Sequence, residues 1–156
     1  MMKSVLARHM LPAVLATAVL LTAAQAADPV HLITREEAGM PAAPKTPAST
    51  RNLTRGPGID TLPTPDKGVD GKPFRLNVRF MPANGVPVDP ATVRVFYRRD
   101  PPVDITQRIK QYITPGGIDA PSVVVPSGNH IIEIEATDKE GRIGRRQITL
   151  TVAPTP

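Results

Sequence analysis

The chain is 156 residues long, a length that allows one domain of ordinary size. It contains 19 Pro and 11 Gly but no Cys and no Trp, and its formal net charge is +5. The Pro and Gly content excludes a helical bundle, and the lack of Cys excludes disulfides, zinc fingers, iron–sulfur clusters and thiol nucleophiles.

Residues 1–26 are typical of a secretory signal peptide. A basic start is followed by an uncharged apolar run over residues 10–24, and Ala24-Gln25-Ala26 matches the cleavage pattern. The run is shorter than the roughly 20 residues that a membrane-spanning helix needs. We therefore expect a periplasmic or secreted protein, with an uncleaved N-terminal anchor as the alternative. Cleavage would also remove two basic residues, which argues against nucleic-acid binding.

Residues 27–67 are expected to form a flexible, proline-rich linker. They show no sustained hydrophobic period, contain no aromatic residue, and are interrupted by six prolines between positions 41 and 65. Such a composition cannot offset the loss of chain entropy by burying apolar surface. The sequence would allow a single helical turn at Ile33–Glu37 and a short edge strand at Gly58–Leu62.

Residues 68–153 are expected to form the folded domain. All five aromatic residues lie between positions 74 and 112, which places the core there. Alternating apolar and polar residues predict half-buried strands, and a short apolar run predicts an edge strand at 122–125. Residues 138–142 have the composition of a tight turn between the last two strands. The alternating segments are residues 74–80, 92–98, 130–137 and 145–152.

One stretch has the period of a helix instead. Ile105, Ile109 and Tyr112 recur at helical spacing, and Asp104 stands where a helix cap is expected. Pro115 and the glycines after it would end the helix. The predicted fold class is therefore all-β: a small antiparallel β-sandwich with one short crossover helix.

The domain resembles bacterial Ig-like domains in two places. The stretch His130–Val152 resembles their last two strands, and Phe80–Gly85 with Val88–Val95 resembles their early strands. The resemblance covers roughly residues 56–152 and implies an Ig-like β-sandwich. Such modules are usually non-catalytic spacers or binding units of envelope proteins, so the resemblance implies a binding or structural role in the bacterial cell envelope.

No residue pattern indicates catalysis. His130 has serines nearby in the sequence but no G-x-S-x-G motif, and we expect it at a strand edge near solvent. Glu133 and Glu135 share the solvent side of one strand, where acidic residues are ordinary rather than a glycosidase pair. No Gly-rich phosphate-binding motif occurs. We expect a protein that is not an enzyme and takes no cofactor.

Metal binding is the alternative function. The chain resembles small periplasmic copper carriers, which use a His near the mature N-terminus, in its signal, its single sandwich and the sequence near Pro87–Val95. Here His31 is fifth after the expected cleavage, and Met40 and Met81 could supply sulfur, but no His or Met cluster occurs. No metal ligand is assigned. Calcium would instead use acidic residues at loops and element ends, namely Asp100, Asp104, Asp119 and Asp138.

A partner surface is expected on outward-facing strand residues. If the outward faces join, the arginines form a cationic strip that could meet an envelope protein or an anionic surface polymer. The alternative is ordinary surface arginine paired with glutamate across strands. Phe96 faces away from Tyr97, so it either packs under the helix as core or marks an exposed apolar patch. The predicted partner surface consists of Arg75, Arg79, Phe96, Arg98 and Arg99.

Overall fold

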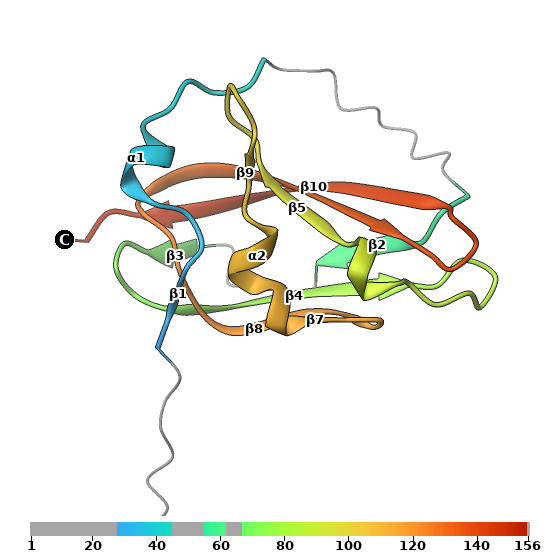
Figure 1. Ribbon diagram of the computed structural model, residues 1–156. Helices are drawn as coiled ribbons and strands as arrows, with labels where there is room; N and C mark the ends of the chain where they lie inside the picture. Colours follow the sequence, from blue (N-terminus) through green and yellow to red (C-terminus); the bar gives the residue numbers. More distant parts are fainter. Residues whose placement is uncertain (1–27, 45–54, 62–66, 156) are drawn as a thin grey trace, which may run out of the picture.

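The computed structural model describes residues 28–44, 55–61 and 67–155, and it shows two sheets packed face to face (Figure 1). The first sheet contains β1 (Val30–His31), β2 (Gly58–Thr61), β4 (Phe74–Met81), β7 (Ile113–Thr114) and β8 (Gly117–Val124). The second contains β3 (Lys67–Val69), β5 (Arg94–Tyr97), β6 (Val103–Asp104), β9 (Gly128–Thr137) and β10 (Ile143–Ala153).

The strand order is β1-β8-β4-β2 in the first sheet, with β7 paired to β8, and β3-β10-β9-β5-β6 in the second. The helical elements within the described residues are α1 (Arg35–Ala38), α2 (Thr106–Ile109) and the 3-10 turns η1 (Pro90–Thr92) and η2 (Lys110–Tyr112). This architecture is an Ig-like β-sandwich, which confirms the predicted fold class. The expected signal peptide, residues 1–26, lies outside the described residues. Among the residues that the structure describes, no helix has the length and hydrophobicity needed to cross a membrane.

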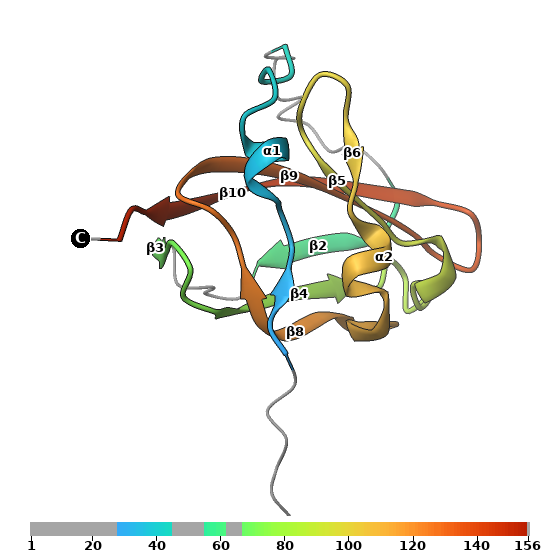
Figure 2. The same cartoon turned by 60° about the vertical axis from the view of Figure 1, so that its left-hand side comes forward.

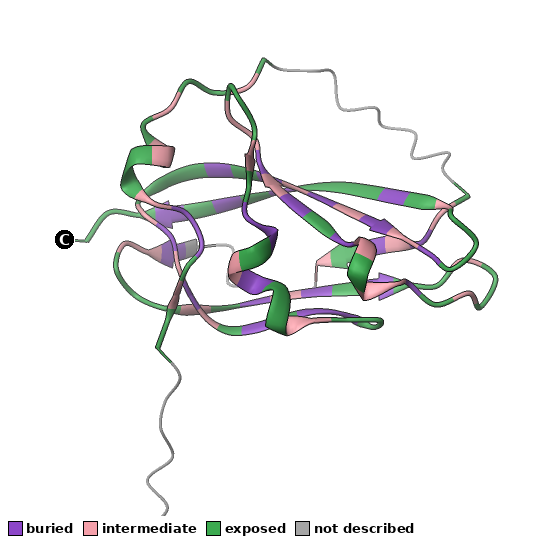
Figure 3. Cartoon of the chain, in the orientation of Figure 1, coloured by how far each residue is buried: buried purple, intermediate pink, exposed green. Residues whose placement is uncertain are grey.

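The core forms where the inward faces of the two sheets meet (Figure 3). Buried and exposed residues alternate along β4 and along β9, as the sequence predicted. Because side chains alternate with a period of two, a one-residue slip would turn every apolar side chain outward, so this pattern fixes the register. The fully buried residues include Leu76 and Val78 from β4, Val95 from β5, and Ile132 and Ile134 from β9.

The hairpin of β9 and β10 is organised by the carboxylate of Asp138. One oxygen accepts hydrogen bonds from the backbone N–H groups of Glu140 (2.9 Å) and Arg142 (3.0 Å), and the other accepts from Arg142 Nε (2.7 Å). Burial raises the pKa of this carboxyl, but the hydrogen bonds outweigh that effect and hold the pKa below its usual value. The predicted turn is confirmed, with Thr137 paired to Ile143.

Two predicted elements differ in extent. The short run at 122–125 was expected at an edge, whereas β8 begins at Gly117 and lies inside the sheet between β1 and β4. The chain approaches β4 closely there: a Cβ on Gly117 would lie 2.0 Å from the carbonyl oxygen of Val78. The expected helix over residues 104–112 is present, but it begins at Thr106 and continues as the 3-10 turn η2.

The largest difference concerns the N-terminal part of the expected linker. Strand β1 pairs in parallel with β8, and Leu32 and Ile33 are fully buried in the core. Helix α1 follows, opened by a capping box in which Thr34 and Glu37 exchange hydrogen bonds. Residues 28–44, called here the N-terminal segment, run from the first sheet toward the second across one side of the sandwich (Figures 1 and 2).

The expectation of a flexible linker over residues 27–67 is therefore wrong for the N-terminal segment. Its apolar stretch is too short to show a period, yet β1 pairs with the end of β8 and the next two residues are buried in the core. The possible helical turn near Ile33–Glu37 and the edge strand at Gly58–Leu62 both correspond to real elements, α1 and β2. Residues 45–54 and 62–66 of the expected linker lie outside the described residues.

Candidate functional site

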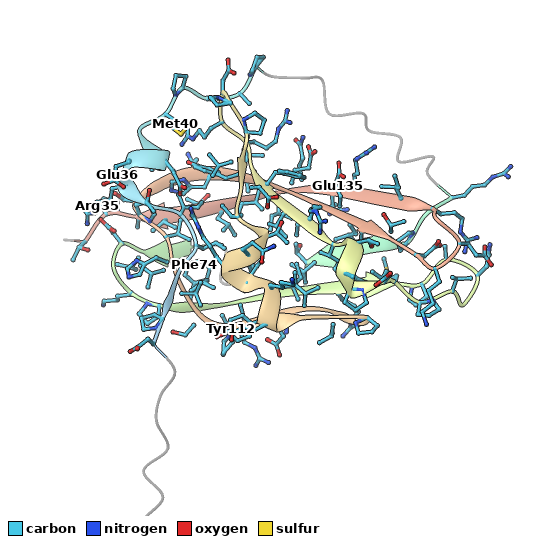
Figure 4. The ribbon with its side chains drawn as sticks, viewed as in Figure 1. Arg35, Glu36, Met40, Phe74, Tyr112 and Glu135 are labelled. Carbon is cyan, nitrogen blue, oxygen red and sulfur yellow. The ribbon has the colours of Figure 1, made fainter. Side chains whose placement is uncertain are left out.

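The outward side of β5, β9 and β10 carries large apolar side chains among charged ones. Phe96 on β5 stands opposite Glu133 on β9, which in turn stands opposite Gln147 on β10. Phe96 is half-buried and does not belong to the residues packed on the core, whereas Ile131 on β9 is 44% exposed. We call this surface the β5–β9–β10 face; Glu135 lies on it (Figure 4).

Two arginines of the β5–β9–β10 face lie near carboxylates of neighbouring strands, whereas the exposed Arg94 on β5 donates to the carbonyl oxygens of Ala91 and Val93. The Arg98 guanidinium lies 3.8 Å from a carboxylate oxygen of Glu133, and Gln147 donates a hydrogen bond of 2.7 Å to the same carboxylate. Arg145 donates to the Glu135 carboxylate at 2.5 Å. The face is thus apolar at Phe96 and Ile131 and carries ion pairs around them.

The predicted partner surface is not continuous. Arg75 and Arg79 lie on β4, with both side chains exposed on the outward side of the first sheet, and thus on the opposite side of the sandwich from Phe96 and Arg98. Arg75 forms a two-pronged ion pair with Asp119, with hydrogen bonds of 2.7 and 2.6 Å. The expected cationic strip is therefore divided by the sandwich itself, because β4 and β5 belong to different sheets.

The sequence left open whether Phe96 packs under the helix or faces outward. The apolar side of α2 enters the core through Ile109, and Ile105 just before the helix is buried as well. The helix therefore packs between the sheets and does not turn Phe96 into a core residue. Of the two alternatives for Phe96, the outward-facing apolar position is the one that the structure favours.

Arg99, the last residue of the predicted surface, belongs to a buried polar chain instead. Its guanidinium lies 4.7 Å from the centroid of the Tyr97 ring and donates a hydrogen bond to the Tyr97 hydroxyl. That hydroxyl is 2.8 Å from Nδ1 of His130, and Nε2 of His130 is 2.8 Å from the carbonyl oxygen of Pro126. Tyr97 and His130 are both buried.

The partners fix the protonation of His130. The Pro126 carbonyl can only accept, so Nε2 carries a proton and donates it. Arg99 can only donate to the Tyr97 oxygen, so the hydroxyl proton is free to be donated to Nδ1. With the Tyr97 hydroxyl donating to Nδ1, the ring is neutral. Burial lowers the pKa of His130, and the hydrogen bond to Pro126 offsets this only in part.

The expectation that His130 lies near solvent is wrong. It was placed at the exposed start of a strand, but its side chain points inward in phase with Ile132 and Ile134. Tyr97 and the Pro126 carbonyl supply the partners that a buried imidazole requires. The sequence signal was present, because His130 continues the inward alternation of β9 by one step.

A second polar contact joins the N-terminal segment to α2. Arg108 donates hydrogen bonds of 2.6 and 2.8 Å to the two carboxylate oxygens of Glu37, and a third of 2.9 Å to the carbonyl oxygen of Leu32. The hydrogen bonds from Arg108 lower the pKa of Glu37 to about 2, although burial opposes them. Sequence reasoning missed this pair; the only signal was the capping pattern of Thr34 and Glu37.

The candidate metal ligands are dispersed. The Asp138 carboxylate accepts hydrogen bonds within its turn, and the Asp119 carboxylate accepts from Arg75. Asp104 accepts a hydrogen bond from the backbone of Thr106. His31 lies exposed on β1, and Met81 lies exposed at the end of β4. Within residues 28–44, 55–61 and 67–155, no three His, Asp or Glu side chains form a group that could hold a metal ion.

Comparison with known proteins gives similarity in fold alone. No protein-family model and no curated protein matches the chain. Two solved structures are similar to it: CopC from Methylosinus trichosporium OB3b, at 16% identity and a TM-score of 0.43, and murine CRIg, at 12% identity and a TM-score of 0.41. Each alignment covers 64% of this chain, together with 96% of CopC and 98% of CRIg.

Proposed function

We propose that this protein is an exported, non-catalytic binding module that engages a partner protein through the β5–β9–β10 face. The observation that carries the proposal is the exposed position of Ile131, 44% accessible, two residues along β9 from Glu133, which is the cross-strand partner of the outward-facing Phe96. An apolar centre within a polar rim is the usual anatomy of a protein interface. Export rests on the signal-peptide pattern of residues 1–26.

The charges of this face favour a protein over an anionic polymer. A polyanion is attracted by cations that have no nearby counter-charge. On the β5–β9–β10 face, however, Arg98 and Arg145 each have a carboxylate partner. Such paired charges supply a rim that excludes water and fixes orientation, while the apolar centre supplies the free energy of binding.

A non-catalytic role is supported by the contacts of the candidate catalytic side chains, which are hydrogen-bonded or ion-paired within the protein. Both ring nitrogens of His130 are hydrogen-bonded inside the protein, so neither is free to move a proton to or from a substrate. Glu133 and Glu135 lie on the outward face and pair with neighbouring side chains. These contacts fit structural roles for all three residues.

The test begins by recovering partners from an envelope extract of the source cell and purifying the recovered protein. Binding of that protein is then measured for the wild type, for Ile131→Ser and for Met81→Ser. Met81 is a matched control because it is 48% exposed on the other sheet. We expect Ile131→Ser to raise the Kd at least about tenfold and Met81→Ser to change it less than about threefold.

Equal effects of the two substitutions would contradict the assignment of the face. A partner that proves to be an anionic polymer, with affinity falling steeply as salt rises, would contradict the protein partner. A melting temperature that rises with copper or calcium, with no partner recovered, would instead support the metal-binding alternative.

A further inference from the structure

We propose that the chain of hydrogen bonds from Arg99 through Tyr97 to His130 is an acid-sensitive latch, which weakens the attachment of the N-terminal segment when His130 is protonated. The attachment in question is the contact of residues 41–42 with residues 99–100, called here the junction. The proposal goes beyond the binding function and does not depend on it.

The first step is that the latch accepts only one charge state. With His130 neutral, one Arg99 Nη donates to the Tyr97 oxygen, the Tyr97 hydroxyl donates to Nδ1 of His130, and Nε2 donates to the Pro126 carbonyl. The buried Arg99 Nε has no hydrogen-bond partner among the described residues. Protonation puts a hydrogen on Nδ1, so His130 and Arg99 both donate to the Tyr97 oxygen. The Tyr97 hydroxyl proton then loses its acceptor in a buried place, which is unfavourable.

The second step is electrostatic. Protonated His130 and the Arg99 guanidinium would be two cations on one hydroxyl oxygen, and the repulsion from Arg99 already opposes protonation of His130. Glu37 on α1 is an acid whose charge acts on Tyr97. Glu37 is held at both oxygens by Arg108 and does not serve as a counter-ion for His130. Leu150, which faces His130 from β10, is uncharged.

The third step connects Arg99 to the N-terminal segment. Arg99 pairs through its backbone with Ala42 in an isolated antiparallel bridge, and the N–H of Asp100 donates to the carbonyl oxygen of Pro41 at 3.1 Å. Arg99 is half-buried, so its side chain is the member of the latch that can move toward solvent. Movement of Arg99 away from a charged His130 therefore loosens the junction.

The size of the effect follows from linkage. A histidine that is neutral in the closed state and titrates near its ordinary 6.5 in the open state favours opening as the pH falls. Between about pH 7.5 and about pH 5.5, the opening equilibrium is expected to increase by at most about tenfold, a limit reached when the closed state takes up no proton in this range. Above about pH 7.5 the latch stays closed, because neither state then takes up the proton.

The test is amide hydrogen exchange of the purified protein at these two pH values. We expect the protection factor of the Asp100 amide to fall at the lower pH, by up to about tenfold. The matched internal control is the Lys139 amide, which donates to the Pro87 carbonyl at 3.2 Å, next to the hairpin turn at the far end of β9. Its protection factor should stay constant, because opening there does not expose His130.

The variant His130→Gln tests the cause. A glutamine amide has one donor and one acceptor group for the same partners and does not titrate. We expect this variant to lose the pH dependence of Asp100 protection. An unchanged pH dependence would overturn the proposal, and so would an equal fall in protection at Asp100 and Lys139, which would indicate global unfolding.

A direct measurement keeps the proposal testable if the variant fails to fold. Nuclear magnetic resonance of the wild-type protein reports the titration of the His130 ring. We expect a neutral ring with its proton on Nε2 at neutral pH, and titration below the ordinary value. A ring that titrates at or above the ordinary value would refute the latch.

Discussion

Truncation of Leu32 tests whether the N-terminal segment is an integral part of the core. Leu32 is fully buried, and its backbone N–H donates to the carbonyl oxygen of Val124 at 3.0 Å. Leu32→Ala keeps that hydrogen bond but removes three carbon atoms from the core. Transfer of these atoms accounts for about 2.4 kcal/mol. The cavity left behind raises the expected loss of unfolding free energy to about 3–4 kcal/mol.

The assay is denaturant unfolding, with thermal unfolding as a second readout. A loss of this size should lower the Tm by more than about 10 °C in a domain of this length. His31→Ala is the matched control at the neighbouring position, because His31 is exposed, and it should change stability by less than about 0.5 kcal/mol. A loss below about 1 kcal/mol for Leu32→Ala would refute the argument, because a free linker would give that result.

Three further predictions concern other contacts. Gly144→Ala should lower the free energy of unfolding by more than about 3 kcal/mol, because its Cβ would lie 2.0 Å from a backbone oxygen. Gly141 lies in open space at a φ of +81°, so Gly141→Ala should lower it by only about 1 kcal/mol in the same denaturation assay. The pKa of Glu37 is lower in the folded state than in the unfolded state, so the wild type should lose stability as the pH falls from about 4.5 to about 2. Glu37→Gln should remove this loss. A Tm that falls equally with pH in both proteins would contradict this prediction. Asp138→Ala should lower the Tm well below that of Glu140→Ala, because Asp138 is buried and Glu140 is exposed; equal melting temperatures would contradict its role in the turn.

The elements that the sequence predicted well are those with a long run of alternating apolar and polar residues. The alternation over residues 74–80 is present as β4, and that over residues 130–137 is present as β9 with two residues added at its start. The turn after Thr137 also followed from composition, because Asp and Gly favour it through local hydrogen bonds. Local pattern is sufficient in these places because each strand places one face on the core.

The features that were missed depend on contacts between distant residues. Leu32 and Ile33 form too short a run to show a period, and they lie in the core because β1, just before them, pairs with the end of β8. The side on which Arg75 and Phe96 lie depends on which sheet each strand joins, and alternation within a strand does not contain that information. Of the residues on the β5–β9–β10 face, the sequence singled out Phe96 and Arg98 but not the exposed Ile131.

The predicted cleavage after Ala26 can be tested against the fold, which requires that the mature chain keep β1 and the buried residues after it. Strand β1 begins at Val30, and the buried pair Leu32 and Ile33 follows at once. Cleavage after Ala26 would leave all of these residues in the mature chain. Intact-mass measurement of the protein recovered after export should therefore give a start at Ala27. A start beyond Ile33 would remove core residues and would contradict the assignment of the N-terminal segment to the folded domain.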